Sequence, residues 1–224
     1  MNNRYAVNDI YPAIQGEGVQ TGVPMVLLRL HGCGVGCPFC DTRETWHFNP
    51  AYEVPTLPAA LGTNERYTRI EAEPLADTIK AQYPALKWVL ITGGEPADQP
   101  LRALVDALHA RGYKIAIETS GTAIGHIDAG IDWICVSPKI GMPGGRTLES
   151  AAIASADEIK MVIGRDRDIE RLEQLISLYP MKESVQICVQ PMSTSPRATD
   201  LCIEMAQLKG WRLSVQVHKY IAQR

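Results

Sequence analysis

Short apolar runs that end in polar or glycine-rich residues, and that alternate with amphipathic segments, constrain the fold of this chain most strongly. Strands buried on both faces form such runs, and their alternation with helices favours a parallel sheet. The six runs are residues 23–30, 88–92, 113–118, 133–136, 158–163 and 185–189. Six strands are too few to close an eight-stranded barrel. We therefore predict an α/β fold, a partial (open) TIM-type barrel with about six parallel strands.

The segments between these runs complete the predicted organisation. Residues 5–14 are expected to form a strand or an extended lead-in. Apolar residues at helical spacing predict helices over residues 74–83, 101–111, 166–179 and 197–209, with Asp166 as the N-cap of the third. Residues 45–73 show no clean periodicity and contain three prolines. We expect them to be an irregular excursion within one domain that spans residues 1–224.

The composition is that of an ordinary globular protein, with 46% hydrophobic and 21% charged residues among 224. The net charge is −3 and the lysines and arginines are dispersed, which argues against a nucleic-acid partner. The sequence predicts no signal peptide and no membrane span. Cys135, Cys188 and Cys202 stand alone in apolar or helical contexts, so we expect them to be buried thiols.

The remaining cysteines, Cys33, Cys37 and Cys40, lie within eight residues of a glycine-rich loop. Such a loop can bring three thiolates to one metal centre, because its closure costs little entropy and glycine permits unusual backbone angles. A structural zinc needs a fourth ligand, and His31 and His47 lie outside the usual spacing. Three thiolates on an iron–sulfur cube leave one iron open, which indicates chemistry at the cluster. A zinc knot or buried structural thiols are the alternative. Reduced thiols in such a loop predict a cytoplasmic location.

The Cys-x3-Cys-x2-Cys spacing, with Phe39 before the last cysteine, resembles that of the radical S-adenosylmethionine (SAM) superfamily. The Gly-Gly-Glu-Pro sequence at residues 93–96 is similar to a second motif of that superfamily. The resemblance implies that Cys33, Cys37 and Cys40 hold a 4Fe-4S cluster whose open iron binds SAM. It also implies a partial barrel, in which the cofactor carries the hard chemistry.

Further motifs, spread from residue 10 to residue 220, resemble one family within that superfamily, the 7-carboxy-7-deazaguanine synthases. The matching segments are residues 15–18 (Gln-Gly-Glu-Gly), 21–22, 29–33, 40–42 (Cys-Asp-Thr), 92–96, 118–122, 137–139 (Ser-Pro-Lys) and 216–220. The resemblance implies a radical SAM carbon–nitrogen lyase of queuosine and 7-deazapurine biosynthesis. Its substrate is 6-carboxy-5,6,7,8-tetrahydropterin, and ammonia is lost as 7-carboxy-7-deazaguanine forms. A magnesium ion, a reductant such as flavodoxin and a homodimer are implied as well.

The same resemblance gives roles to individual residues. It implies that Thr42 binds magnesium. The residues implied to contact the pterin are Ile14, Gln15, Gly16, Arg29, Thr92, Glu118 and His218. Those implied to contact SAM are Phe39, Cys40, Asp41, Gly94, Ser137, Pro138, Lys139 and Gln190.

The residues alone leave some of these roles open. Arg29 lies within an apolar run, where a charge needs a partner, and a substrate carboxylate and an internal salt bridge serve equally well. Without the resemblance, Lys139 would be interpreted as a solvated loop lysine and His218 as a packed histidine.

Two other functions are weighed against the synthase. A glycyl-radical-enzyme activase shares the cysteine loop and the Gly-Gly-Glu-Pro turn. However, it acts on a protein and has no need of the Gln-Gly-Glu-Gly and Cys-Asp-Thr sequences. A non-catalytic zinc or iron–sulfur binding module, the third hypothesis, leaves the polar residues at the strand ends unexplained.

Overall fold

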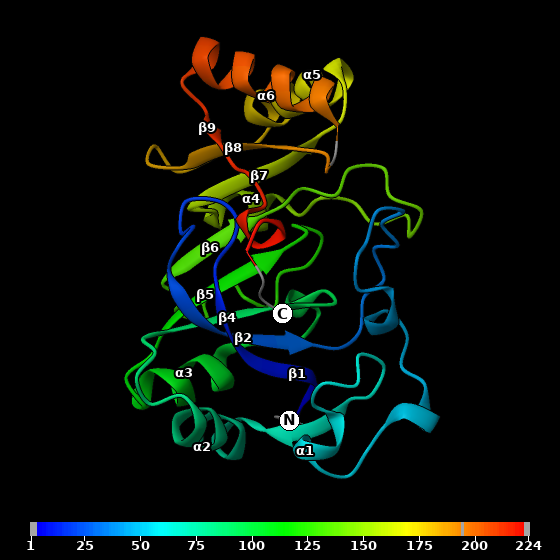
Figure 1. Ribbon diagram of the computed structural model, residues 1–224, viewed down its shortest axis with the longest axis vertical. Helices are drawn as coiled ribbons and strands as arrows, with labels where there is room; N and C mark the ends of the chain where they lie inside the picture. Colours follow the sequence, from blue (N-terminus) through cyan, green and yellow to red (C-terminus); the bar gives the residue numbers. More distant parts are fainter. Residues whose placement is uncertain (1–3, 194, 222–224) are drawn as a thin grey trace.

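The computed structural model describes residues 4–193 and 195–221, and within these ranges nine strands form one sheet. The strand order is β3-β1-β2-β4-β5-β6-β7-β8-β9 (Figure 1). The strands are β1 (Arg4–Ile14), β2 (Pro24–Leu30), β3 (Thr68–Glu71), β4 (Trp88–Gly93), β5 (Lys114–Thr119), β6 (Trp133–Val136), β7 (Glu158–Ile163), β8 (Gln186–Pro191) and β9 (Arg212–Leu213). Strands β2 and β4 to β9 are parallel, and β1 is antiparallel to both of its neighbours. The predicted open α/β barrel is confirmed, and the two-residue β9 adds a seventh parallel strand to the six predicted.

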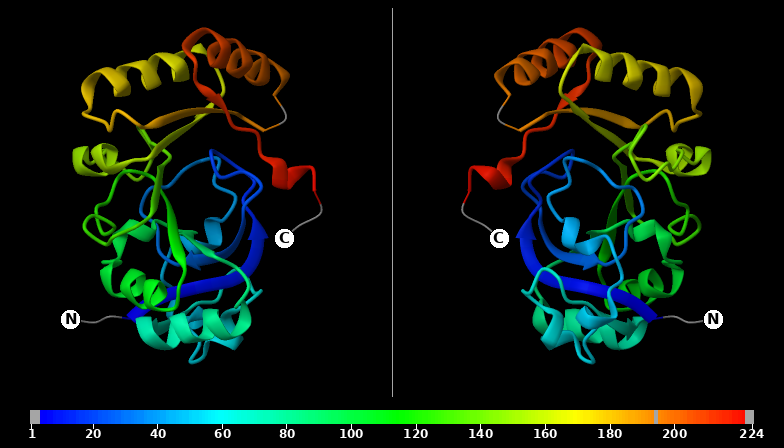
Figure 2. Two further views of the ribbon diagram at one scale, coloured as in Figure 1. Left: turned by 90° about the vertical axis from the view of Figure 1, so that its left-hand side faces the viewer. Right: turned by 90° about the vertical axis from the view of Figure 1, so that its right-hand side faces the viewer.

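The helices lie on the convex, outer side of the curved sheet (Figure 2). They are α1 (Leu57–Ala60), α2 (Ala72–Gln82), α3 (Arg102–Ala110), α4 (Ser150–Ser155), α5 (Asp166–Leu178) and α6 (Pro196–Lys209). The prediction that Asp166 caps α5 is wrong. Asp166 is the first helical residue, and the carboxylate of Asp168 accepts hydrogen bonds from the backbone N–H groups of Gly164 and Arg165, at 3.0 and 3.1 Å. None of the described helices has both the length and the apolar character needed to cross a membrane.

The excursion at residues 45–73 contains more regular structure than predicted. It includes α1, the strand β3, which pairs with β1 through Tyr5 and Ile70, and the first two residues of α2. Strand β3 has only four residues and a mixed sequence, Thr-Arg-Ile-Glu. Such a strand gives no periodicity to recognise, because an edge position beside β1 stabilises it rather than burial on both faces.

Alternation along the parallel strands separates an apolar outer face from a polar inner face. In β5, Ile115 and Ile117 pack in the main outer core, whereas Ala116 belongs to a small inner cluster with Met25 and Leu90. Because side chains alternate with a period of two, Glu118 follows Ala116 onto the inner face. The same count along β2, β4, β7 and β8 places four more polar residues on the inner face. Arg29, Thr92 and Gln190 lie near the carboxyl ends of their strands, and Lys160 lies in the middle of β7.

The β1–β2 loop and the C-terminal segment meet on the inner side of the sheet (Figure 2). The backbone N–H of Val217 donates to the carbonyl of Gly16 at 2.9 Å, and that of Gly18 donates to the Ser214 hydroxyl at 2.8 Å. The N–H of Val19 donates to the carboxylate of Glu158 on β7 at 3.1 Å. These bonds connect the first hairpin to the last strands across the open side of the barrel.

The three cysteines outside the loop, Cys135, Cys188 and Cys202, are free and buried, as predicted. Cys202 lies on the buried side of α6 and packs in the outer core. Burial raises the pKa of all three thiols, so they remain protonated at neutral pH.

Candidate active site

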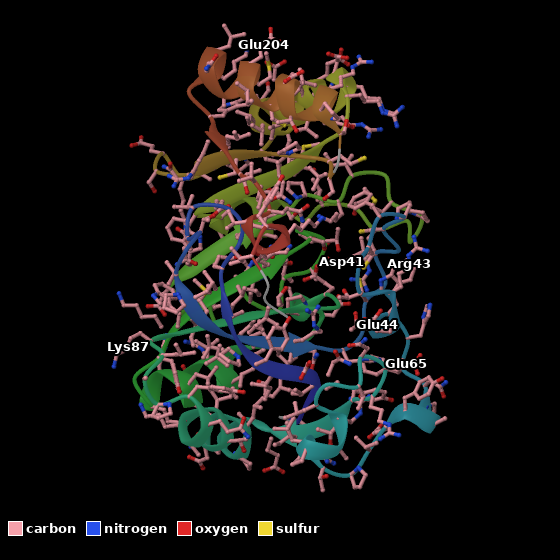
Figure 3. The ribbon with its side chains drawn as sticks, in the orientation of Figure 1. Asp41, Arg43, Glu44, Glu65, Lys87 and Glu204 are labelled. Atoms are coloured by element: carbon pink, nitrogen blue, oxygen red, sulfur yellow. The ribbon has the colours of Figure 1, made fainter. Side chains whose placement is uncertain are left out.

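One cavity of about 520 Å³ lies at the carboxyl ends of the parallel strands. It brings together the three loop cysteines and every predicted site residue except Pro138, which is buried beside it. The predicted residues in its wall are Ile14, Gln15, Gly16, Arg29, Cys33, Cys37, Phe39, Cys40, Asp41, Thr42, Thr92, Gly94, Glu118, Ser137, Lys139, Gln190 and His218. Asp41 lies on the side of the cysteine loop that faces the body of the molecule, and Arg43 on the outer side (Figure 3).

The cysteine loop is fixed by backbone contacts on three sides. The N–H of Cys33 donates to the carbonyl of Trp46 at 3.0 Å, and the N–H of Gly144 donates to the carbonyl of Val35 at 3.0 Å. On the third side, the turn after β4 packs directly against the loop. A Cβ on Gly94 would lie 2.6 Å from the carbonyl carbon of Gly32 and would overlap its oxygen. Glycine at position 94 is therefore a condition for this packing.

The loop supplies a donor set that suits an iron–sulfur cluster. The Cys40 sulfur accepts hydrogen bonds from the Trp46 indole N–H at 3.3 Å and from the Thr42 backbone N–H at 3.4 Å. Among the described residues, no group of three or more His, Cys, Asp or Glu is close enough to hold a single metal ion. A tetrahedral zinc would need thiolate sulfurs about 3.8 Å apart. A cluster takes each thiolate on a separate iron, so three free thiols carried by one loop suit a cluster.

Lys139 reaches the same cavity from the loop after β6. Its ammonium donates to the Ser137 hydroxyl at 2.5 Å and to the Ser137 carbonyl at 3.0 Å, and it lies 6.0 Å from the centre of the Phe39 ring. Burial lowers its pKa, and its charge partly opposes the effect of burial on Cys37, which raises the pKa of that thiol. The interpretation of Lys139 as a solvated loop lysine is therefore wrong.

Arg29 forms no ion pair with any described residue. Its guanidinium donates to the Tyr11 hydroxyl at 3.0 Å, and it pairs in register with Thr92 of β4. An internal salt bridge, one of the two predicted alternatives, is thus not found in the described part of the chain. The half-buried cation faces the cavity with hydrogen-bonding capacity to spare.

Gly16 and His218 come together from opposite ends of the chain. A Cβ on Gly16 would lie 2.9 Å from both the backbone nitrogen and the Cβ of His218 and still closer to the imidazole Nδ1. The small size of glycine therefore allows the C-terminal segment to close onto the Gln-Gly-Glu-Gly loop, and this places His218 in the cavity wall.

The cavity wall also contains polar residues to which the sequence interpretation gave no role, among them Glu17, Lys160 and Gln216. Lys160 is 3% exposed and lies between Glu17, at 2.6 Å, and Glu118, at 3.0 Å. Lys160 could have been identified from the sequence because it lies in the apolar run of residues 158–163. A charge in a buried strand needs a partner, as it does at Arg29.

The open parallel sheet, the three-cysteine loop after β2 and the glycine turn after β4 define a radical SAM enzyme. A profile of the Radical SAM superfamily matches residues 27–179. The chain is 40% identical over 220 residues to the 7-carboxy-7-deazaguanine synthase of Escherichia coli K12, with 97% of this chain and 98% of that protein covered. It is 36% identical over 239 residues to the protein of that name from Bradyrhizobium diazoefficiens, with 98% and 99% covered.

A solved structure agrees with these relatives. The crystal structure of QueE from Escherichia coli matches with a TM-score of 0.89 and 39% identity, covering 96% of this chain and 95% of that one. The chain therefore belongs to the 7-carboxy-7-deazaguanine synthase family of the radical SAM superfamily. Membership implies a 4Fe-4S cluster and SAM as cofactors.

Proposed function

We propose that this chain converts 6-carboxy-5,6,7,8-tetrahydropterin into 7-carboxy-7-deazaguanine and ammonia, acting as one radical SAM domain. The observation that carries the proposal is the shared cavity, in which the cysteine loop and the polar strand ends meet. The two products together contain all the atoms of the substrate, so the reaction consumes no oxidant. Such a balance suits a cofactor that is regenerated in each turnover.

Cys33, Cys37 and Cys40 would hold the cluster. Eight residues that line the cavity or lie beside it would contact SAM. When bound, these cofactors supply the hydrogen-atom abstraction that starts the reaction. The chain's own part is to bind, orient and shield. Gly94 lets the cofactor approach the backbone, Lys139 and Ser137 offer donors for its oxygens, and Asp41 and Gln190 offer acceptors. The other three are Phe39, Cys40 and Pro138.

The pterin would be held at both of its polar ends. Arg29 and His218 would bind the carboxylate, Arg29 by the bidentate contact that a guanidinium makes. The backbone of residues 14–16, with Gln15, and the hydroxyl of Thr92 would contact the ring. Glu118 would accept hydrogen bonds from the aminopyrimidinone at the other end.

A magnesium ion at Thr42 is supported by position. The Thr42 side chain lines the cavity beside Cys40, and its hydroxyl oxygen lies 3.7 Å from the Cys40 sulfur. Magnesium prefers oxygen ligands and keeps several waters, so one hydroxyl together with substrate oxygens would suffice.

The enzyme acts on a small molecule and requires a reductant. We infer that the reductant is a flavodoxin-like protein, that the enzyme works as a homodimer and that it works in the reducing environment of the cytoplasm. The buried free thiols outside the cluster loop agree with such a compartment.

Anaerobic turnover tests the proposed function. The cluster is reconstituted, dithionite, SAM and magnesium are added, and the pterin is followed by chromatography and mass. We expect 7-carboxy-7-deazaguanine and ammonia in equal amounts. Formation of 5′-deoxyadenosine without that product would point to another substrate, such as the partner protein of an activase. A fully loaded cluster that cleaves no SAM would support a binding module.

A further inference from the structure

Lys160 is the buried member of a half-buried group of charges at the end of the cavity formed by β5 and β7. Its ammonium donates to Glu17 Oε2 at 2.6 Å and to Glu118 Oε1 at 3.0 Å. Two carboxylates share one ammonium, so the group carries a net charge of −1. A half-buried group with one excess negative charge favours a ligand that brings hydrogen-bond donors.

The two oxygens of Glu118 are in different situations. Oε1 accepts from Lys160 and also from the amide of Gln15, at 3.0 Å. Oε2 accepts no hydrogen bond from any described residue, although the side chain is 26% exposed and lines the cavity. Two donors on one oxygen fix the plane of the carboxylate. The other oxygen is left for a ligand.

Glu17 holds Lys160 in place from the opposite side. Its Oε1 accepts from the Gln216 amide at 2.7 Å, which ties the group to the C-terminal segment beside His218. Burial opposes the charge of Glu17, but the Lys160 ammonium outweighs burial and lowers the pKa of this carboxyl to about 2. Burial likewise opposes the charge of Lys160, and the neighbouring Glu118 and Glu17 carboxylates outweigh it and raise the pKa of Lys160. Glu17 and Lys160 therefore both stay charged at neutral pH.

We propose that Lys160, held by Glu17, is a positioning residue that orients Glu118 so that its free oxygen accepts from the 2-amino edge of the pterin. This inference rests on the proposed function, which supplies the substrate. The 2-amino group and the adjacent ring N–H form a pair of donors, and a fixed anionic acceptor recognises them. Without the ammonium, the two half-buried carboxylates would repel each other, and Glu118 would rotate away from this position.

The test compares Lys160→Met with the wild-type enzyme on two compounds. One is the pterin, and the other is its analogue with oxygen in place of the 2-amino group. For the wild type we expect the pterin to be favoured in KM by about 10- to 100-fold, the range of one or two hydrogen bonds to a charged group. For Lys160→Met we expect the pterin KM to rise by a similar factor, while the analogue KM changes little, so that the preference shrinks.

The control is Lys182→Met, which makes the same change at a lysine outside the cavity. Lys182 pairs with Asp157 at 2.6 Å and is 38% exposed; both KM values should remain at the wild-type level. Because Lys160→Met leaves two half-buried carboxylates without their cation, the double variant Lys160→Met with Glu17→Gln is measured as well. It removes the ion pair as a unit. We expect it to retain its cluster and still lose the preference.

The outcomes separate the two proposals. A wild type that makes no product from the pterin overturns the proposed function and this inference with it. Turnover with equal KM for both compounds in the wild type overturns the inference alone. An unchanged preference for the pterin in the variants also overturns the inference alone. So does an equal rise in KM for both compounds, because that is the result of general structural damage.

Discussion

Replacing Gly94 with Ala tests whether the turn after β4 sets the position of the cysteine loop. The added Cβ would lie 2.6 Å from the carbonyl carbon of Gly32 and 3.1 Å from its nitrogen, and both atoms belong to the backbone. Ordinary contact requires at least 3.4 Å, so the loop must move by roughly 1 Å. A shift of this size also weakens the hydrogen bond from the Glu95 N–H to the Gly32 carbonyl, now 2.8 Å.

The expected cost follows from that displacement. Overpacking costs about 1–3 kcal/mol, and for a chain of this size about 2 kcal/mol lowers the unfolding midpoint by roughly 4–8 °C. A 1 Å misplacement lowers turnover by about 100-fold. Thermal unfolding, iron content and anaerobic turnover are measured together. Gly164→Ala is the matched control, since its Cβ would meet the flexible end of Met192 at 3.0 Å. Wild-type stability, iron content and turnover in Gly94→Ala would refute the reasoning.

Four further predictions concern single residues. Arg29→Met removes the cavity-facing guanidinium and should raise the pterin KM by about 10- to 100-fold, so an unchanged KM in steady-state assays contradicts its role. Thr42→Ala should raise the magnesium concentration for half-maximal activity severalfold without loss of iron, and an unaltered magnesium titration removes Thr42 from the site. Trp46→Phe deletes the indole donor to the Cys40 sulfur and should lower the cluster's reduction potential in an EPR-monitored titration; an equal or higher potential would count against it. His126 is buried, and burial lowers its pKa from 6.5 to about 4. Between these pH values the unfolded chain binds more protons than the folded chain. The free energy of unfolding should therefore fall by up to about 3 kcal/mol as the pH is lowered from 6.5 to 4. His126→Phe should flatten that slope in urea titrations, and an equally steep slope would assign it to other groups.

The fold was predictable because burial on both faces leaves a continuous apolar run. Each of the six runs forms a parallel strand, with ends within two residues of the prediction. The elements that escaped prediction lack this property. β3 is a four-residue edge strand, and α4 has only six residues, Ser-Ala-Ala-Ile-Ala-Ser, too few to show a helical period.

The site was predictable where residues follow the ends of apolar runs, because parallel strands bring those ends to one edge. The resemblance then gave them roles. Lys160 and Glu17 were missed because they pair with each other from positions 143 residues apart in the chain. No local sequence pattern indicates such a pairing. The Asp166 cap failed for a related reason. Asp166 and Asp168 both lie near the helix start, and only backbone geometry decides which carboxylate turns back to the N–H groups.

The inner face of the sheet also explains how a nearly flat substrate would bind in one orientation. Arg29 on β2 and Glu118 on β5 are separated by β4, which is two strand spacings or roughly 10 Å. A pterin that carries its carboxylate toward Arg29 therefore presents its donor edge toward Glu118, and the reversed orientation places like charges together. Strand β2 leads directly into the loop of Cys33. The carboxylate of the pterin is on C6. We therefore expect the pair of charges that fixes the orientation, Arg29 and Glu118, to bring C6 to the side of the cavity where the cysteines lie.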